Sequence, residues 1–134
     1  MKLKVAFVCT GNSCRSQMAE GFAKKLGKDE FEVYSSGTHP TSEINPLAIE
    51  VMNEAGIDIT EQYPKTLDEI PSELDILITM GCGVVCPFVP NRHKEDWGLD
   101  DPVGKPTEEF RRVRDIIERK VTELIDNIRS NKLY

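Results

Sequence analysis

Residues 3–16, LKVAFVCTGNSCRS, decide the fold of this chain. The first part of the stretch is a short apolar run, which is typical of a buried parallel strand. Gly11 and Asn12 mark a turn directly after it, and a helix is expected from about Ser16 to Gly27. The apolar face of that helix would consist of Met18, Ala19, Phe22, Ala23 and Leu26. A strand that leads through a short turn into a helix predicts an α/β fold.

The same alternation of strands and helices continues along the chain. Residues 31–36 and 75–80 have the pattern of strands, and 93–99 suggest a weaker fourth strand. Asn45, followed by Pro46, predicts the start of a helix that Gly56 ends. Thr107 is expected to cap the last helix, whose apolar positions fall three or four residues apart. These positions are Phe110, Val113, Ile117, Val121, Leu124 and Ile128.

This pattern predicts a single α/β domain over residues 1–134. Its parallel sheet should have four strands in the order 2-1-3-4, with right-handed crossovers and helices on both faces. In such a sheet the connections diverge between strands one and three, and ligands bind there, beyond the carboxyl ends of the strands. Cys9 follows the first strand and Cys82 the third, so these two cysteines should be neighbours.

The composition excludes several classes of protein. A formal net charge of −6 argues against nucleic acid as a partner, because nucleic acid requires a basic face. The sequence has no apolar run near the ~20 residues of a membrane helix and no signal-peptide pattern, which favours a cytoplasmic protein. An acidic protein that binds an anion must concentrate positive potential locally, through backbone N–H groups, a helix N-terminus and a fixed cation.

The loop from Cys9 to Ser16 has the form Cys, five residues, Arg, Ser. It joins a strand to a helix N-terminus, so its N–H groups can converge on an anion. Arg15 offers a planar, two-pronged donor to an oxyanion, and both it and the helix favour the thiolate of Cys9. The alternative is that Cys9 is a small buried apolar residue in an ordinary turn. The complete predicted oxyanion-binding loop is Thr10, Gly11, Asn12, Ser13, Cys14, Arg15 and Ser16.

On this loop, on Cys82 and Cys86, and on the segment WGLDDP at 97–102, the chain resembles the low-molecular-weight tyrosine phosphatase superfamily. Within it, the chain is similar to the arsenate reductases that a thioredoxin-type thiol system regenerates. The resemblance implies that Cys9 attacks arsenate and that Cys82 then attacks the Cys9 sulfur, which releases arsenite. Cys86 would next attack Cys82 and pass the disulfide to thioredoxin or another thiol donor. Only three residues separate Cys82 from Cys86, fewer than in the thioredoxin-linked reductases that it resembles.

The resemblance also implies an acid and an ion. Asp101, held in extended geometry by the following proline, is the expected general acid, with Asp100 as its rival. No tightly bound cofactor is expected. A potassium ion near the loop is the one candidate, with Asn12, Glu20 and Ser35 as its ligands.

Three functions remain open at this point. The first is arsenate reduction through Cys9, Arg15, Cys82, Cys86 and Asp101, with residual phosphatase activity. The second is a tyrosine phosphatase that forms a phospho-enzyme on Cys9 and has no use for the second cysteine pair. The third is a structural zinc site made by the four cysteines, whose spacing allows it.

Several other residues have less specific interpretations. Cys14 is interpreted either as a thiol that protects Cys9 by reversible disulfide formation or as a packing residue. His39 and His93 are interpreted as ordinary histidines, and Trp97 as a core residue.

Overall fold

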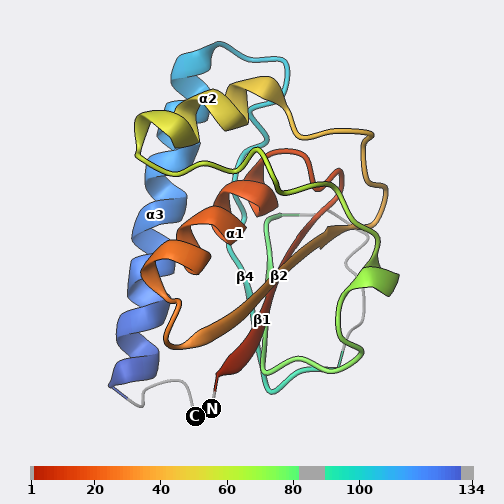
Figure 1. The fold of residues 1–134 in the computed structure, drawn as a ribbon, viewed down its shortest axis with the longest axis vertical. Helices are drawn as coiled ribbons and strands as arrows, with labels where there is room; N and C mark the ends of the chain where they lie inside the picture. The colour runs from red at the N-terminus through yellow and green to blue at the C-terminus, as the bar shows by residue number, and fades with distance from the viewer. Residues whose placement is uncertain (1, 82–89, 131–134) are drawn as a thin grey trace.

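The computed structural model describes residues 2–81 and 90–130 (Figure 1). The elements follow the predicted alternation, and their bounds are β1 (Leu3–Cys9), α1 (Arg15–Leu26), β2 (Phe31–Gly37), α2 (Pro46–Glu54), the 3₁₀ helix η1 (Leu67–Glu69), β3 (Ile76–Thr79), β4 (His93–Asp96) and α3 (Thr107–Arg129). None of the helices in these two ranges combines the length and the apolar character that crossing a membrane requires.

The four strands form one sheet in the order β2-β1-β3-β4, and all neighbouring strands are parallel. This confirms the predicted topology. The carboxyl end of β1 lies between those of its neighbours, since Val8 pairs with Ser36 of β2 and Thr79 of β3. The oxyanion loop therefore leaves the sheet at the point where the connections diverge.

Helices cover both faces of the sheet, but unequally. Val5 and Phe7 of β1 belong to the large core that the three α-helices build on one face. Ala6 and Val8 point the other way, into a smaller cluster with residues around η1. This division follows from the two-residue period of a strand. The helices α1 and α3 pack side by side over the sheet (Figure 1).

Most helix boundaries follow the predicted signals. The side chain of Asn45 accepts a hydrogen bond from the Leu47 N–H at 2.9 Å, with Pro46 at the first position of α2. Gly56 follows this helix with a positive φ of 80°, as a terminating glycine should. Trp97 is buried against Phe7, which confirms it as a core residue.

Two details were predicted wrongly. Thr107 does not cap α3, because the extended Pro106 is the capping residue and Thr107 is the first helical one. Leu26 is 38% exposed instead of lying on the buried face of α1. It is the last residue of that helix, where the packed face has already ended.

Candidate active site

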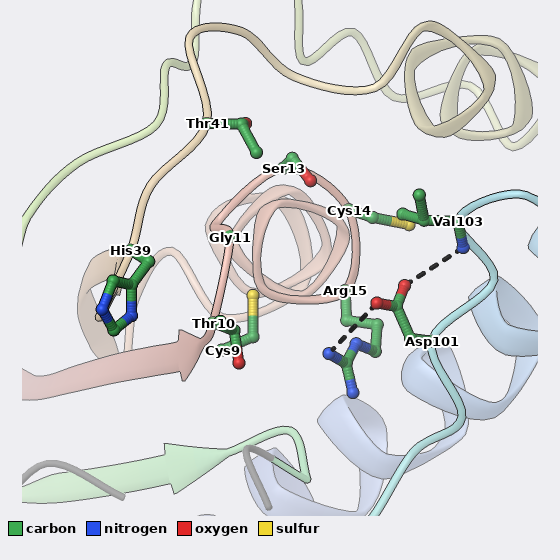
Figure 2. Close-up of a pocket in the computed structure, with 10 residues that line it drawn as sticks. All are labelled: Cys9, Thr10, Gly11, Ser13, Cys14, Arg15, His39, Thr41, Asp101 and Val103. Carbon is green, nitrogen blue, oxygen red and sulfur yellow. Dashed lines mark hydrogen bonds and ion pairs between the residues drawn. The ribbon is translucent and has the colours of Figure 1, made fainter. Parts of the chain in front are cut away.

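A cavity of about 280 Å³ opens above the loop that follows β1. Figure 2 shows its wall, which brings the oxyanion loop together with two distant segments. The lining residues are Cys9, Thr10, Gly11, Ser13, Cys14, Arg15, His39, Thr41, Asp101 and Val103. No side chain of the described residues caps the start of α1, so its free N–H groups remain directed towards the loop.

The sulfur of Cys9 is buried and lies among hydrogen-bond donors. The Asn12 N–H donates to Sγ at 3.2 Å, and Ser16 Oγ lies 2.8 Å from Sγ. A third contact orients this serine, because Asn12 Nδ2 donates to Ser16 Oγ at 2.7 Å. The serine hydroxyl therefore accepts from Asn12 and has its own proton available for the sulfur. The Cys9 sulfur thus faces two possible hydrogen-bond donors.

Asn12 holds the loop in shape. It is fully buried and has a φ of 49°, a left-handed conformation that asparagine tolerates better than most residues. Its Oδ1 accepts from the Lys65 N–H at 2.8 Å and from Gln17 Nε2 at 3.1 Å. Gln17 Nε2 also lies 3.0 Å from the Asn12 carbonyl oxygen. Gly11, the other residue that marks this turn in the sequence, does not have a positive φ, so Asn12 is the one of the two that adopts the left-handed conformation.

Arg15 is buried and bound on one side to the scaffold. Its Nη1 donates to the carbonyl oxygens of Met80, at 2.7 Å, and Leu99, at 2.8 Å. Its Nη2 lies 3.8 Å from Asp101 Oδ2. The guanidinium is thereby fixed at the cavity wall beside the loop (Figure 2).

The structure separates the two candidate acids. Asp101 lines the cavity, with a side chain that is 55% exposed, and its Oδ1 accepts from the Val103 N–H at 3.1 Å. Asp100 instead pairs with Arg112 of α3 at 3.1 Å. Only Asp101 is therefore placed where it could reach an anion bound by Arg15.

His39 and Cys14 also line the cavity, and the sequence alone did not give either of them a definite role there. His39 lines the cavity, although it was predicted to be an ordinary histidine. Its N–H donates to the Thr10 carbonyl at 2.9 Å, a contact between segments that no local signal reveals. Burial, and after it the charge of Asp101, raise the pKa of the Cys14 thiol well above its usual range. Cys14 is therefore far less prone to ionise than an exposed cysteine.

The predicted potassium ligands lie close together but have other partners. Ser35 Oγ donates to Glu20 Oε1. Lys65 Nζ lies 3.4 Å from the same oxygen, and Lys24 Nζ lies 2.5 Å from Glu20 Oε2. Lys65 was not expected here from sequence, because it follows Glu20 by 45 positions, whereas Lys24 lies only four residues from Glu20 on the same helix.

The second cysteine pair lies outside the described residues. Cys82 and Cys86 are both in the segment 82–89, so their predicted relay stays a prediction. The zinc alternative needs the same two cysteines. Within residues 2–81 and 90–130, no group of three or more histidine, cysteine and acidic side chains is arranged to hold a metal ion.

Comparison with known proteins gives consistent matches over nearly the whole chain. The family model described as "Low molecular weight phosphotyrosine protein phosphatase" matches residues 4–86 and 82–133. Arsenate reductase 2 of Staphylococcus haemolyticus is 48% identical over 125 residues, which cover 90% of this chain and 94% of that protein.

Solved structures give the same result. An arsenate reductase in the phosphate-binding state has a TM-score of 0.86 and 44% identity, and the match covers 96% of this chain and 99% of that one. A thioredoxin-dependent arsenate reductase of Corynebacterium glutamicum has a TM-score of 0.80 and 34% identity, over 97% of this chain and 63% of that one.

Proposed function

Because the chain belongs to the low molecular weight phosphotyrosine protein phosphatase family and is 48% identical to a curated arsenate reductase, we propose that it reduces arsenate to arsenite. The observation that carries this proposal is the sulfur of Cys9, which receives two hydrogen bonds beneath a cavity that Arg15 and Asp101 also line. Such a site binds a tetrahedral oxyanion and presents a nucleophile to its central atom.

In the first step, the Cys9 thiolate attacks arsenic(V) and forms a sulfur–arsenic bond. The departing oxygen takes a proton from Asp101 and leaves as water. Arg15 holds the oxyanion with the edge formed by Nε and Nη2, since Nη1 is committed to two carbonyl groups. The Asn12 N–H and the Ser16 hydroxyl stabilise the thiolate before the attack.

In the second step, the Cys82 thiolate attacks the Cys9 sulfur. A Cys9–Cys82 disulfide forms, the sulfur–arsenic bond breaks, and its electron pair leaves with arsenic, which departs as arsenite. Cys86 then attacks Cys82, which frees the Cys9 thiolate and leaves a Cys82–Cys86 disulfide. A dithiol such as thioredoxin supplies two electrons to reduce this disulfide. The thioredoxin-dependent relative supports this choice of donor class.

Phosphatase activity is the second candidate function. The family match supports it, and Cys9, Arg15 and Asp101 are the same groups that a phospho-enzyme mechanism needs. Phosphorus is not reduced, however, so phosphate-ester hydrolysis makes no demand on the second cysteine pair.

The two functions are separated by matched serine variants. Arsenate-dependent oxidation of NADPH, measured with thioredoxin and its reductase, should disappear in both Cys9→Ser and Cys82→Ser. Hydrolysis of p-nitrophenyl phosphate should disappear in Cys9→Ser and persist in Cys82→Ser. Normal arsenate turnover by Cys82→Ser would refute the relay. Zinc analysis of the purified protein tests the third alternative, a structural zinc site. Stoichiometric zinc would contradict a free Cys9 thiolate.

A further inference from the structure

Glu20 is a buried carboxylate that the chain neutralises with its own cations. The side chain is only 4% exposed, yet both oxygens have partners. Lys24 lies against Oε2, while Lys65 and Ser35 lie against Oε1. A carboxylate removed from water requires such partners, because an unpaired buried charge is costly. Glu20 stands in α1, one turn beyond the residue that donates to the Cys9 sulfur.

The ammonium group of Lys65 lies in surroundings that suit a small monovalent cation. The lysine side chain is 11% exposed. Besides Glu20, Nζ contacts the Tyr63 carbonyl oxygen at 2.8 Å and lies 4.5 Å from the centre of the Tyr63 ring. Carboxylate, carbonyl oxygen and aromatic face all attract positive charge. The ammonium group of Lys65 thus occupies the place that a bound alkali ion would take.

The three predicted potassium ligands do not fit a further cation. Both acceptor positions of Asn12 Oδ1 are used, by Lys65 N–H and Gln17 Nε2. Ser35 donates its hydroxyl proton to Glu20 and is oriented by that bond. One carboxylate with two ammonium groups already carries a net charge of +1, which a potassium ion would raise to +2. Like charges in a poorly hydrated site repel strongly.

We propose that Lys65 is a positioning residue whose own ammonium group takes the place of a bound potassium ion. The oxyanion loop is thereby held in place without potassium. The bracing runs through the main chain of the same residue. The Lys65 N–H donates to Asn12 Oδ1, Asn12 Nδ2 donates to Ser16 Oγ, and Ser16 Oγ is hydrogen-bonded to the Cys9 sulfur. The pair with Glu20 fixes Lys65 against α1, which keeps the donor of this chain in place.

The first test leaves Lys65 unchanged. The thermal unfolding midpoint of the wild-type protein and the rate of Cys9 alkylation by iodoacetamide are measured in KCl, NaCl and choline chloride at equal ionic strength. A Cys14→Ser background leaves Cys9 as the reactive thiol of the loop. We expect the same values in all three salts. A rise that is specific to potassium would overturn the proposal.

The second test removes the ammonium group. Lys65→Met nearly keeps the length of the side chain and keeps the main-chain N–H, and should slow alkylation of Cys9 at neutral pH roughly tenfold, the lower end of the loss found when a residue that supports a metal ligand is removed. Lys65→Arg, which keeps the cation, should restore most of the rate. Lys24→Met is the matched control, because Lys24 contacts the same carboxylate but is 51% exposed. Equal rates in Lys65→Met and Lys24→Met would refute the positioning role.

The role of Lys65 in turnover rests on the proposed function, but these measurements do not. Alkylation and unfolding use no arsenate, so they report on Lys65 even if arsenate reduction is not observed. Arsenate reduction measured in potassium-free buffer adds the functional result, with full activity expected.

Discussion

Replacing Ser16 with alanine tests the hydrogen bond that stabilises the Cys9 thiolate. Ser16 Oγ lies 2.8 Å from Sγ, belongs to a fully buried residue, and accepts a hydrogen bond from Asn12 Nδ2. A hydrogen bond to a charged group contributes about 1.5–3 kcal/mol. Since about 1.4 kcal/mol corresponds to a factor of ten, its loss should slow the alkylation of Cys9 at neutral pH roughly ten- to a hundredfold.

The assay is the rate of iodoacetamide alkylation as a function of pH, in a Cys14→Ser background. Ser13→Ala is the matched control, because Ser13 belongs to the same loop and lines the cavity without a hydrogen bond to the Cys9 sulfur. We expect Cys9 of the Ser13 variant to be alkylated at the wild-type rate. An unchanged rate in the Ser16 variant would refute the assignment of the hydroxyl as donor to the thiolate.

The same substitution should also lower the stability of the fold. Without Ser16, the buried Nδ2 of Asn12 loses its acceptor, and an unsatisfied buried donor costs about 1–3 kcal/mol. Urea unfolding of the variant measures this loss. The two effects are independent, since alkylation is measured on folded protein.

Three other predictions concern packing, pH and reactivity. In Gly37→Ala, a Cβ would lie 2.5 Å from a carbonyl oxygen of the oxyanion loop, so phosphate binding measured by calorimetry should weaken markedly. Hydrogen bonding from Arg111 is the first cause that lowers the pKa of Glu54 from 4.5 to about 2. A lowered carboxyl pKa stabilises the folded state above the unfolded value. The difference in unfolding midpoint between wild type and Glu54→Gln should therefore be largest at neutral pH and disappear as pH falls from 4.5 towards 2. Because burial raises the pKa of Cys14, iodoacetamide at pH 7 should label Cys9 before Cys14, which mass spectrometry of Cys9→Ser and Cys14→Ser can verify.

Local signals account for most of the fold that could be predicted from sequence. Asn45 and Pro46 lie next to each other and define a helix start by themselves, so their prediction needed no tertiary information. Thr107 was expected as the cap of α3 because threonine is a good capping residue. Pro106, in extended geometry, occupies that position instead. When two adjacent residues both suit a helix start, propensity alone does not decide which of them is the capping residue.

The candidate site was predictable only where its residues are contiguous. The loop around Cys9 carries its own pattern, and the order of the strands placed it at the correct edge of the sheet. Lys65 and Gln17 support Asn12 through contacts that depend on how the chain folds back, and neither belongs to a local motif. His39 likewise enters the cavity wall because its main chain pairs with Thr10. Such contacts are properties of the tertiary structure.

Arg15 has a structural role as well as its proposed role in binding the oxyanion. Its Nη1 joins the end of β3, through Met80, to the segment after β4, through Leu99. An inactive Arg15 variant would therefore not by itself show that Arg15 binds the substrate, because the same substitution removes the hydrogen bonds that join the ends of β3 and β4. Lysine has a single ammonium group, so it could not donate hydrogen bonds to both carbonyl oxygens and also bind an oxyanion through a second edge. A relative with this arrangement would therefore need a guanidinium at this position even if it acted on a different anion.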